Sequence, residues 1–148
     1  MKPKIFIARG VSSNELLESV FDRYNIKDRT LKYGEYGKPY LASGDLFFNL
    51  SHCRDMVVCA VFDREVGIDI QKIDYRERVI NRVCTRAEAA SIKTPEDFTR
   101  MWVLKESFAK CDGTGLSYGL KNINTESLKD YEVFKIGDFL VATCYNTR

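Results

Sequence analysis

Short apolar runs bounded by turn residues predict several β-strands in this chain. The expected strands cover residues 4–9, 47–51, 56–62, 66–73, 131–136 and 139–145. The strand from residue 66 alternates most clearly, because Val66, Ile68 and Ile70 would face one side while Asp69 and Gln71 face the other. Turns are expected at 63–65 and 137–138, where charged residues or glycine interrupt the apolar pattern.

Apolar residues at helical spacing predict helices between these strands. The helices begin after residue 12 or 13, around 75 to 83, around 86 to 92, and after residue 94. The last is the clearest, because Thr94 is a good N-cap, Pro95 suits the first helical position, and Gly113 and Gly115 would end it. This order predicts an α+β fold, a single compact domain of residues 1–148 whose halves, about 1–64 and 65–148, are related.

Composition narrows the class of protein. The chain has 148 residues, 45% of them hydrophobic and 30% charged, as expected for a globular domain. Its 23 Lys and Arg residues nearly balance 21 Asp and Glu residues, and this net charge of +2 argues against a nucleic-acid binder. Five scattered cysteines without a C-x-x-C pair favour a reducing cytoplasm. The N-terminal apolar run is too short for a signal peptide, and no run approaches the roughly 20 residues of a membrane span.

The first cluster that could carry chemistry is Asp69 with Gln71 on the alternating strand. A carboxylate placed between apolar residues is costly to bury without a partner. One interpretation is a polar strand face in contact with water. The other is a hard-cation site, because carboxylate oxygens suit Mg²⁺ and Gln71, on the same face as Asp69, adds a neutral oxygen.

The second cluster lies on the helix after Thr94. Trp102, Glu106 and Lys110 are four residues apart and therefore share one stripe of this helix. One interpretation is a surface ion pair between Glu106 and Lys110, worth about a few tenths of a kcal/mol. The other is a carboxylate and an ammonium group that together hold a metal ion and phosphate oxygens.

The third cluster joins Ser51 and His52, at the end of an expected strand, with the upstream loop Gly37-Lys38-Pro39. Adjacent serine and histidine residues do not form a nucleophile triad, and the chain has one histidine. His52 is therefore either structural or a ligand-binding group. The loop and the Ser-His pair suit phosphate contacts through backbone N–H, ammonium and hydroxyl groups, although the spacing of a Walker loop is absent.

Taken in order, these segments resemble the Sfp-type 4′-phosphopantetheinyl transferases. Five motifs carry the resemblance, and they lie at residues 37–39, 48–52, 66–70, 102–110 and 113–117. A single one of these motifs is unspecific, but five in register across residues 33–117 are specific.

The resemblance implies two pseudo-twofold-related α+β halves with the active site in the cleft between them. It also implies a Mg²⁺-dependent enzyme that transfers the 4′-phosphopantetheine group of coenzyme A to a serine of an apo acyl or peptidyl carrier protein. Adenosine 3′,5′-bisphosphate would be released. We expect a monomeric, cytoplasmic protein without nucleic-acid or membrane partners. Which carrier is served, in fatty acid, polyketide or nonribosomal peptide biosynthesis, stays open.

The resemblance also assigns the catalytic and metal-binding groups. Asp69 and Glu106 match the metal carboxylates, and Gln71 stands where many relatives carry a further acid, so Mg²⁺ binding should be weaker. Lys110 matches a lysine that contacts the coenzyme A phosphates and stabilises the transferring phosphate. Glu106, directly or through a metal-bound water, is the expected base for the carrier serine, with Glu88 as the alternative.

The contacts expected for coenzyme A come from the third cluster. Gly37, Lys38 and Pro39 match the loop at the adenosine end, and Ser51 and His52 match the pair that touches its phosphates. The N-terminal half is short and lacks the basic helical region that holds the 3′-phosphate in longer relatives; Arg9 is a candidate substitute. This departure and Gln71 motivate an alternative function, a catalytically weakened module that binds coenzyme A or a carrier protein.

A group of arginines allows two interpretations. Its members are Arg76, Arg78, Arg82 and Arg86. Because carrier proteins are commonly acidic around their serine, these arginines suit a docking face, but the same run is equally typical of a solvated helix surface.

Overall fold

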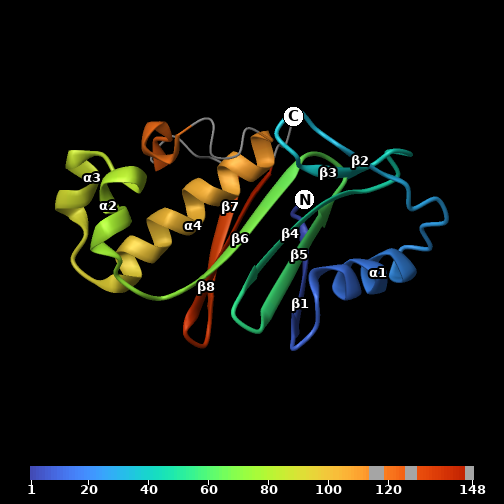
Figure 1. The fold of residues 1–148 in the computed structure, drawn as a ribbon, viewed down its shortest axis with the longest axis horizontal. Helices are drawn as coiled ribbons and strands as arrows, with labels where there is room; N and C mark the ends of the chain where they lie inside the picture. The colour runs from blue at the N-terminus through green and yellow to red at the C-terminus, as the bar shows by residue number, and fades with distance from the viewer. Residues whose placement is uncertain (114–118, 126–129, 146–148) are drawn as a thin grey trace.

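The computed structural model describes residues 1–113, 119–125 and 130–145, which form two three-stranded antiparallel sheets with helices packed on them (Figure 1). The strands are β1 (Lys4–Arg9), β2 (Leu31–Tyr33), β3 (Pro39–Leu41), β4 (Phe47–Cys53), β5 (Met56–Phe62), β6 (Val66–Lys72), β7 (Tyr131–Ile136) and β8 (Phe139–Tyr145). The helices are α1 (Ser13–Arg23), α2 (Glu77–Val83), α3 (Arg86–Ser91), α4 (Pro95–Asp112) and the short 3₁₀ helix η2 (Leu120–Asn122). The predicted α+β class is confirmed.

Each half of the chain contributes one sheet. The first has the strand order β1-β5-β4 and the second β6-β8-β7, and β2 pairs with β3 in a separate hairpin. This hairpin lies in a stretch expected to be largely a loop. A pseudo-twofold relation between the halves stays a prediction.

The core lies on both faces of the first sheet. Helix α1 packs on one face, where the rings of Phe21 and Phe48 meet edge to face with centroids 5.6 Å apart. The other face of β5 packs against β6 and β8, with Val58, Ile68 and Val141 fully buried. Strand β5 is therefore buried along its whole length, as its unbroken apolar sequence requires.

The helix that carries the second motif forms as its end signals predict. Thr94 is the N-cap of α4 and shares a capping box with Asp97, and Pro95 occupies the first turn. Gly113 ends the helix with φ 75°, a conformation that favours glycine. The second predicted stop, Gly115, lies outside the described residues. These caps place Glu106 and Lys110 in the C-terminal half of α4.

A glycine allows α4 to lie directly on β6. A Cβ atom built on Gly67 would overlap the backbone of Ser107 and Cys111, so no larger residue fits between the strand and the helix. The close approach brings the side chains that flank Gly67 on β6 next to those of α4. The position of the site therefore depends on Gly67.

Side chains, rather than a backbone ladder, join the two sheets where β4 and β6 lie side by side (Figure 1). The amide N–H of Ile68 donates to Asn49 Oδ1 (2.8 Å), and that of Ile70 donates to Ser51 Oγ (3.3 Å). These two amides are on either side of Asp69. The seam between β4 and β6 therefore holds the backbone of Asp69 from both sides.

Element ends differ from the expected ranges by a few residues. Strand β4 continues to Cys53 rather than ending at Ser51, because Cys53 still pairs with Met56 in the hairpin. Strand β6 ends at Lys72, and α2 begins at Glu77. In the described part of the chain, no helix combines the length and apolar character needed to span a membrane.

Candidate active site

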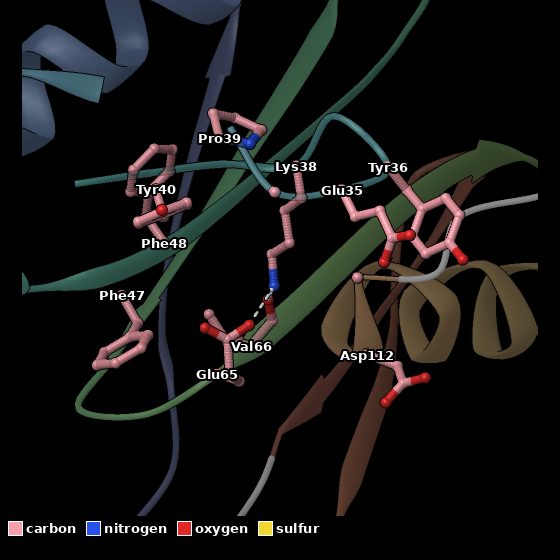
Figure 2. Close-up of a pocket in the computed structure, with 12 residues that line it drawn as sticks. Glu35, Tyr36, Lys38, Pro39, Tyr40, Phe47, Phe48, Glu65, Val66 and Asp112 are labelled. Carbon is pink, nitrogen blue, oxygen red and sulfur yellow. Dashed lines mark hydrogen bonds and ion pairs between the residues drawn. The ribbon is translucent and has the colours of Figure 1, made fainter. Parts of the chain in front are cut away.

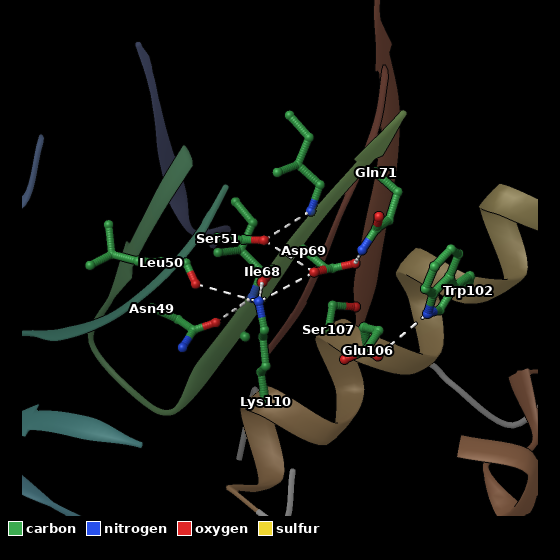
Figure 3. A network of polar contacts seen from close by, with 12 residues as sticks. Asn49, Leu50, Ser51, Ile68, Asp69, Gln71, Trp102, Glu106, Ser107 and Lys110 are labelled. Carbon is green, nitrogen blue, oxygen red and sulfur yellow. Dashed lines mark hydrogen bonds and ion pairs between the residues drawn. The ribbon is translucent and has the colours of Figure 1, made fainter. Parts of the chain in front are cut away.

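Asp69 is at the centre of a buried polar network on β6 (Figure 3). Its Oδ1 accepts hydrogen bonds from Ser51 Oγ (3.1 Å) and Lys110 Nζ (3.2 Å), and its Oδ2 accepts one from Gln71 Nε2 (3.2 Å). Burial raises the pKa of Asp69, while Lys110, Gln71 and Ser51 act in the opposite direction. The residue is only 3% exposed, so the interpretation of a water-facing carboxylate is wrong.

Lys110 reaches from α4 into the seam between the two sheets. Besides Asp69, its Nζ donates to the carbonyl oxygens of Ile68 (3.1 Å) and, at 3.5 Å, Leu50. Among the described residues its ion pair is with Asp69, not with Glu106 on its own helix, so the surface-pair interpretation is wrong. Lys110 therefore brings a positive charge to the point where β4, β6 and α4 meet.

Glu106 is the second carboxylate of the site. It is half-buried, and its Oε1 accepts a hydrogen bond from Trp102 Nε1 at 3.4 Å. Burial raises the pKa of Glu106, and the negative charge of Asp69 raises it further, against the effects of Lys110 and Trp102. Asp69 is thus close enough for its charge to disfavour the ionised form of Glu106.

The residues present fit a hard divalent cation. Two carboxylates that repel each other in a partly buried site are stabilised by a shared positive charge, and oxygen ligands suit Mg²⁺. Gln71 lies on the same face of β6 as Asp69, as the strand alternation predicts, and its side-chain amide N–H faces the Asp69 carboxylate. Within the described ranges, no group of three or more His, Cys, Asp and Glu side chains that could hold a metal ion comes together.

The side chains of Ser51 and His52 point to opposite faces of β4, because successive side chains alternate along a strand. Ser51 is buried in the Asp69 network, where its hydroxyl donates to Asp69 and accepts from Ile70. His52 is exposed. The structure thus brings Ser51, but not His52, into contact with the predicted metal carboxylate.

Lys38 and Pro39, from the loop Gly37-Lys38-Pro39, line a cavity of about 320 Å³ (Figure 2). Lys38 Nζ donates to Glu65 Oε2 (2.9 Å), to the carbonyl of Val66 (3.0 Å) and, at 3.4 Å, to that of Cys111. These bonds tie the loop to the start of β6 and the end of α4. The loop that the sequence assigns to phosphate contacts therefore lies beside the helix that carries Glu106 and Lys110.

Glu88, the alternative base, is held by a different interaction. Lys105 is completely buried, and its Nζ donates to Glu88 Oε1 (2.7 Å) and to the carbonyl of Val83 (2.6 Å). The same carboxylate caps α3 by accepting from the Thr85 amide. Burial would raise the pKa of Glu88, but the bonds from Lys105 and Thr85 outweigh it and lower the pKa.

Sequence reasoning missed the buried Lys105–Glu88 pair. The two residues lie 17 positions apart in sequence and on different helices. The signal was present, because Thr85 and Glu88 have the spacing of a capping box, which predicts that Glu88 turns back toward its own helix start.

Comparison with known proteins shows the family to which the chain belongs. A family model described as ACPS, the 4′-phosphopantetheinyl transferase superfamily, matches residues 65–141. A 4′-phosphopantetheinyl transferase of Bacillus subtilis is 37% identical over an aligned length of 119 residues, and the match covers 72% of this chain and 52% of the relative. The L-aminoadipate-semialdehyde dehydrogenase-phosphopantetheinyl transferase of Xenopus laevis is 38% identical over an aligned length of 112 residues, and the match covers 61% of this chain and 37% of the relative.

A third relative covers more of the chain. The 4′-phosphopantetheinyl transferase Sfp of Bacillus subtilis (strain 168) is 29% identical over an aligned length of 136 residues, and the match covers 84% of this chain and 61% of the relative. The chain thus spans from about a third to three fifths of the length of these relatives. The matched family region contains Asp69, Gln71, Glu106 and Lys110. The chain belongs to the 4′-phosphopantetheinyl transferase superfamily.

Proposed function

We propose that this protein transfers the 4′-phosphopantetheine group of coenzyme A to a serine of an apo acyl or peptidyl carrier protein. The observation that carries the proposal is the meeting of Asp69, Glu106 and Lys110 at the seam, beside the loop of Lys38. The serine oxygen forms a bond to phosphorus, the pyrophosphate P–O bond breaks, and adenosine 3′,5′-bisphosphate leaves. Negative charge on the phosphate oxygens is thereby brought to a site with two ammonium groups.

Asp69 and Glu106 are the groups proposed to hold Mg²⁺, with Gln71 as a third oxygen donor. When bound, the ion would neutralise charge on the diphosphate oxygens. Ser51 holds the Asp69 carboxylate from β4, and Gln71 holds it from β6, so its orientation is already set by two hydrogen bonds.

Glu106 is the better candidate for the base that takes the serine proton. Its raised pKa favours proton acceptance near neutral pH, whereas the lowered pKa of Glu88 and its bond to Lys105 disfavour that role. Lys110 is placed to stabilise charge on the transferring phosphate. The coenzyme A contacts proposed for Gly37, Lys38, Pro39, Ser51 and His52 follow the family resemblance.

The proposed function is tested by intact-mass spectrometry of several apo carriers incubated with this protein, coenzyme A and Mg²⁺. The carrier is expected to gain one phosphopantetheine. Asp69→Ala and Glu106→Ala are each expected to slow modification at least about tenfold, the loss found even for groups that only support metal ligands. Asp138→Ala, an exposed carboxylate in the β7–β8 turn, is the matched control.

Two results would count against these assignments. Unmodified carriers throughout the panel would contradict transferase activity, and tight coenzyme A binding without modification would support the alternative of a binding module. Full activity of both alanine variants would contradict the metal assignment.

The carrier is proposed to dock on the arginines of α2 and α3. Arg76, Arg78, Arg82 and Arg86 are all exposed, and Arg76 lies 5.3 Å from the centroid of the Trp102 ring. Because Trp102 also donates to Glu106, this basic face borders the proposed catalytic carboxylate. An acidic carrier bound here would bring its serine toward the seam.

Reversing one charge tests the docking face. Arg82→Glu is expected to lower kcat/KM for an acidic carrier about tenfold at low salt, because a like charge would face the partner, and the loss should shrink at high salt. The KM for coenzyme A should stay unchanged. Lys27→Glu, an exposed lysine beyond the end of α1, is the control, and equal losses in both variants would exclude a specific face.

A further inference from the structure

Asn49 is a buried polar residue to which the mechanism gives no role. It lies in the middle of β4 and is 6% exposed. Its Oδ1 accepts the hydrogen bond from the Ile68 amide at 2.8 Å. The orientation of the side-chain amide is therefore determined, because only its oxygen can accept that bond.

The other end of this amide points away from β6 (Figure 3). Asn49 Nδ2 has no hydrogen-bond partner in the ranges that the structure describes. A buried donor left without a partner costs about 1–3 kcal/mol, so native proteins rarely retain one without a use. The unpaired Nδ2 of Asn49 therefore indicates a position where a ligand atom would accept a hydrogen bond.

Asn49 lines a cavity of about 240 Å³ between the Gly37-Lys38-Pro39 loop and the end of α4. Lys38 and Lys110 line the same cavity. Each ammonium group is positively charged and already donates to one carboxylate and two carbonyl oxygens. The amide Nδ2 is therefore the donor of this lining that has no partner among the described residues. A negatively charged acceptor such as a phosphate oxygen complements Nδ2 and the two positive charges beside it.

We propose that Asn49 serves the site with both ends of its amide: Oδ1 positions β6, and Nδ2 donates to a phosphate oxygen of coenzyme A. This inference rests on the proposed function for the identity of the ligand. The positioning role of Oδ1 follows from its hydrogen bond across the seam between β4 and β6, since the Ile68 amide that it accepts from immediately precedes Asp69. Loss of Oδ1 would release one of the two side chains that hold the Asp69 backbone.

Two substitutions separate the two ends. Asn49→Asp keeps the acceptor for Ile68 but replaces the donor, whereas Asn49→Leu removes both. Titration calorimetry with coenzyme A should show affinity lowered about tenfold or more in both variants, the size expected for a lost hydrogen bond to a charged group. Thermal unfolding should show a larger loss of stability for Asn49→Leu, because the Ile68 amide is then unpaired.

Controls keep this test specific. Asn14→Asp places the same charge on the exposed surface of α1 and should leave coenzyme A affinity unchanged. If Asn49→Asp does not fold, Asn49→Ser removes the amide without adding charge and is expected to show the same weakening. An Asn49→Asp or folded Asn49→Ser affinity within twofold of wild type would overturn the inference alone. A wild-type chain that binds no coenzyme A would overturn the proposed function and the inference with it.

Discussion

Gly67→Ala is expected to lower the rate of carrier modification about 100-fold, the size of loss that a shift of about 1 Å in a catalytic group produces. The added Cβ would overlap backbone atoms of Ser107 and Cys111, and backbone atoms cannot rotate aside as a side chain can. Helix α4 would have to move off β6. Glu106 and Lys110, which immediately precede Ser107 and Cys111 on that helix, would then lose their positions relative to Asp69.

Stability should fall in the same variant. Overpacking of a closely packed interface costs about 1–3 kcal/mol, and here the nearest atoms that the added Cβ meets all belong to the backbone. Urea unfolding measures this loss, and mass spectrometry of the carrier measures the rate per folded molecule.

Gly44→Ala is the control, because it replaces a glycine where the added Cβ would not collide with another part of the chain. Gly44 has φ 73°, but a Cβ there would meet no atom within 4 Å. Its replacement is expected to cost about 1 kcal/mol through backbone strain while the activity of the folded protein stays unchanged. Wild-type activity in Gly67→Ala would contradict the claim that this approach of α4 to β6 sets the site.

Local patterns predicted the parts of the fold that depend on neighbouring residues. Thr94, Pro95 and Gly113 predicted the ends of α4, since caps are determined by a few residues around each end. The alternation of apolar and polar residues from Val66 predicted β6, since this pattern too is a property of neighbouring residues. The hairpin of β2 and β3 was missed as a strand pair because strands of three residues carry too little pattern.

The site itself depends on contacts between distant segments. Helical spacing paired Glu106 with Lys110, but the packing of α4 on β6 directs Lys110 to Asp69, 41 residues away in sequence. Ser51 reaches Asp69 from β4 across 18 residues. The family resemblance named these residues, whereas their hydrogen bonds required the arrangement of the two sheets.

The buried pair of Lys105 and Glu88 leads to the second large prediction. Glu88→Gln is expected to lower the free energy of unfolding by about 3 kcal/mol at neutral pH, because breaking a buried ion pair leaves one charge without its counter-charge. Lys105 is 0% exposed, and water cannot replace the lost carboxylate. Glutamine preserves the capping box with Thr85, so the loss reports the charge and not the cap.

The effect should depend on pH in a defined direction. The folded-state pKa of Glu88 is lowered from the ordinary value of 4.5, so the ion pair contributes its full stability above that value. This contribution is lost as the pH falls through the lowered folded-state pKa. Urea unfolding at a series of pH values should therefore show the wild type and Glu88→Gln converging on acidification.

A double variant distinguishes the ion pair from general damage to the packing. Lys105→Met combined with Glu88→Gln removes both charges, and replacing a buried pair with uncharged groups is often neutral or stabilising. The double variant should therefore be more stable than Glu88→Gln alone. Such recovery would show that the isolated buried ammonium group causes the loss. If the double variant is instead less stable than Glu88→Gln alone, the Lys105 side chain stabilises the fold through its hydrogen bond to the Val83 carbonyl. That bond joins α4, at the residue before Glu106, to the end of α2.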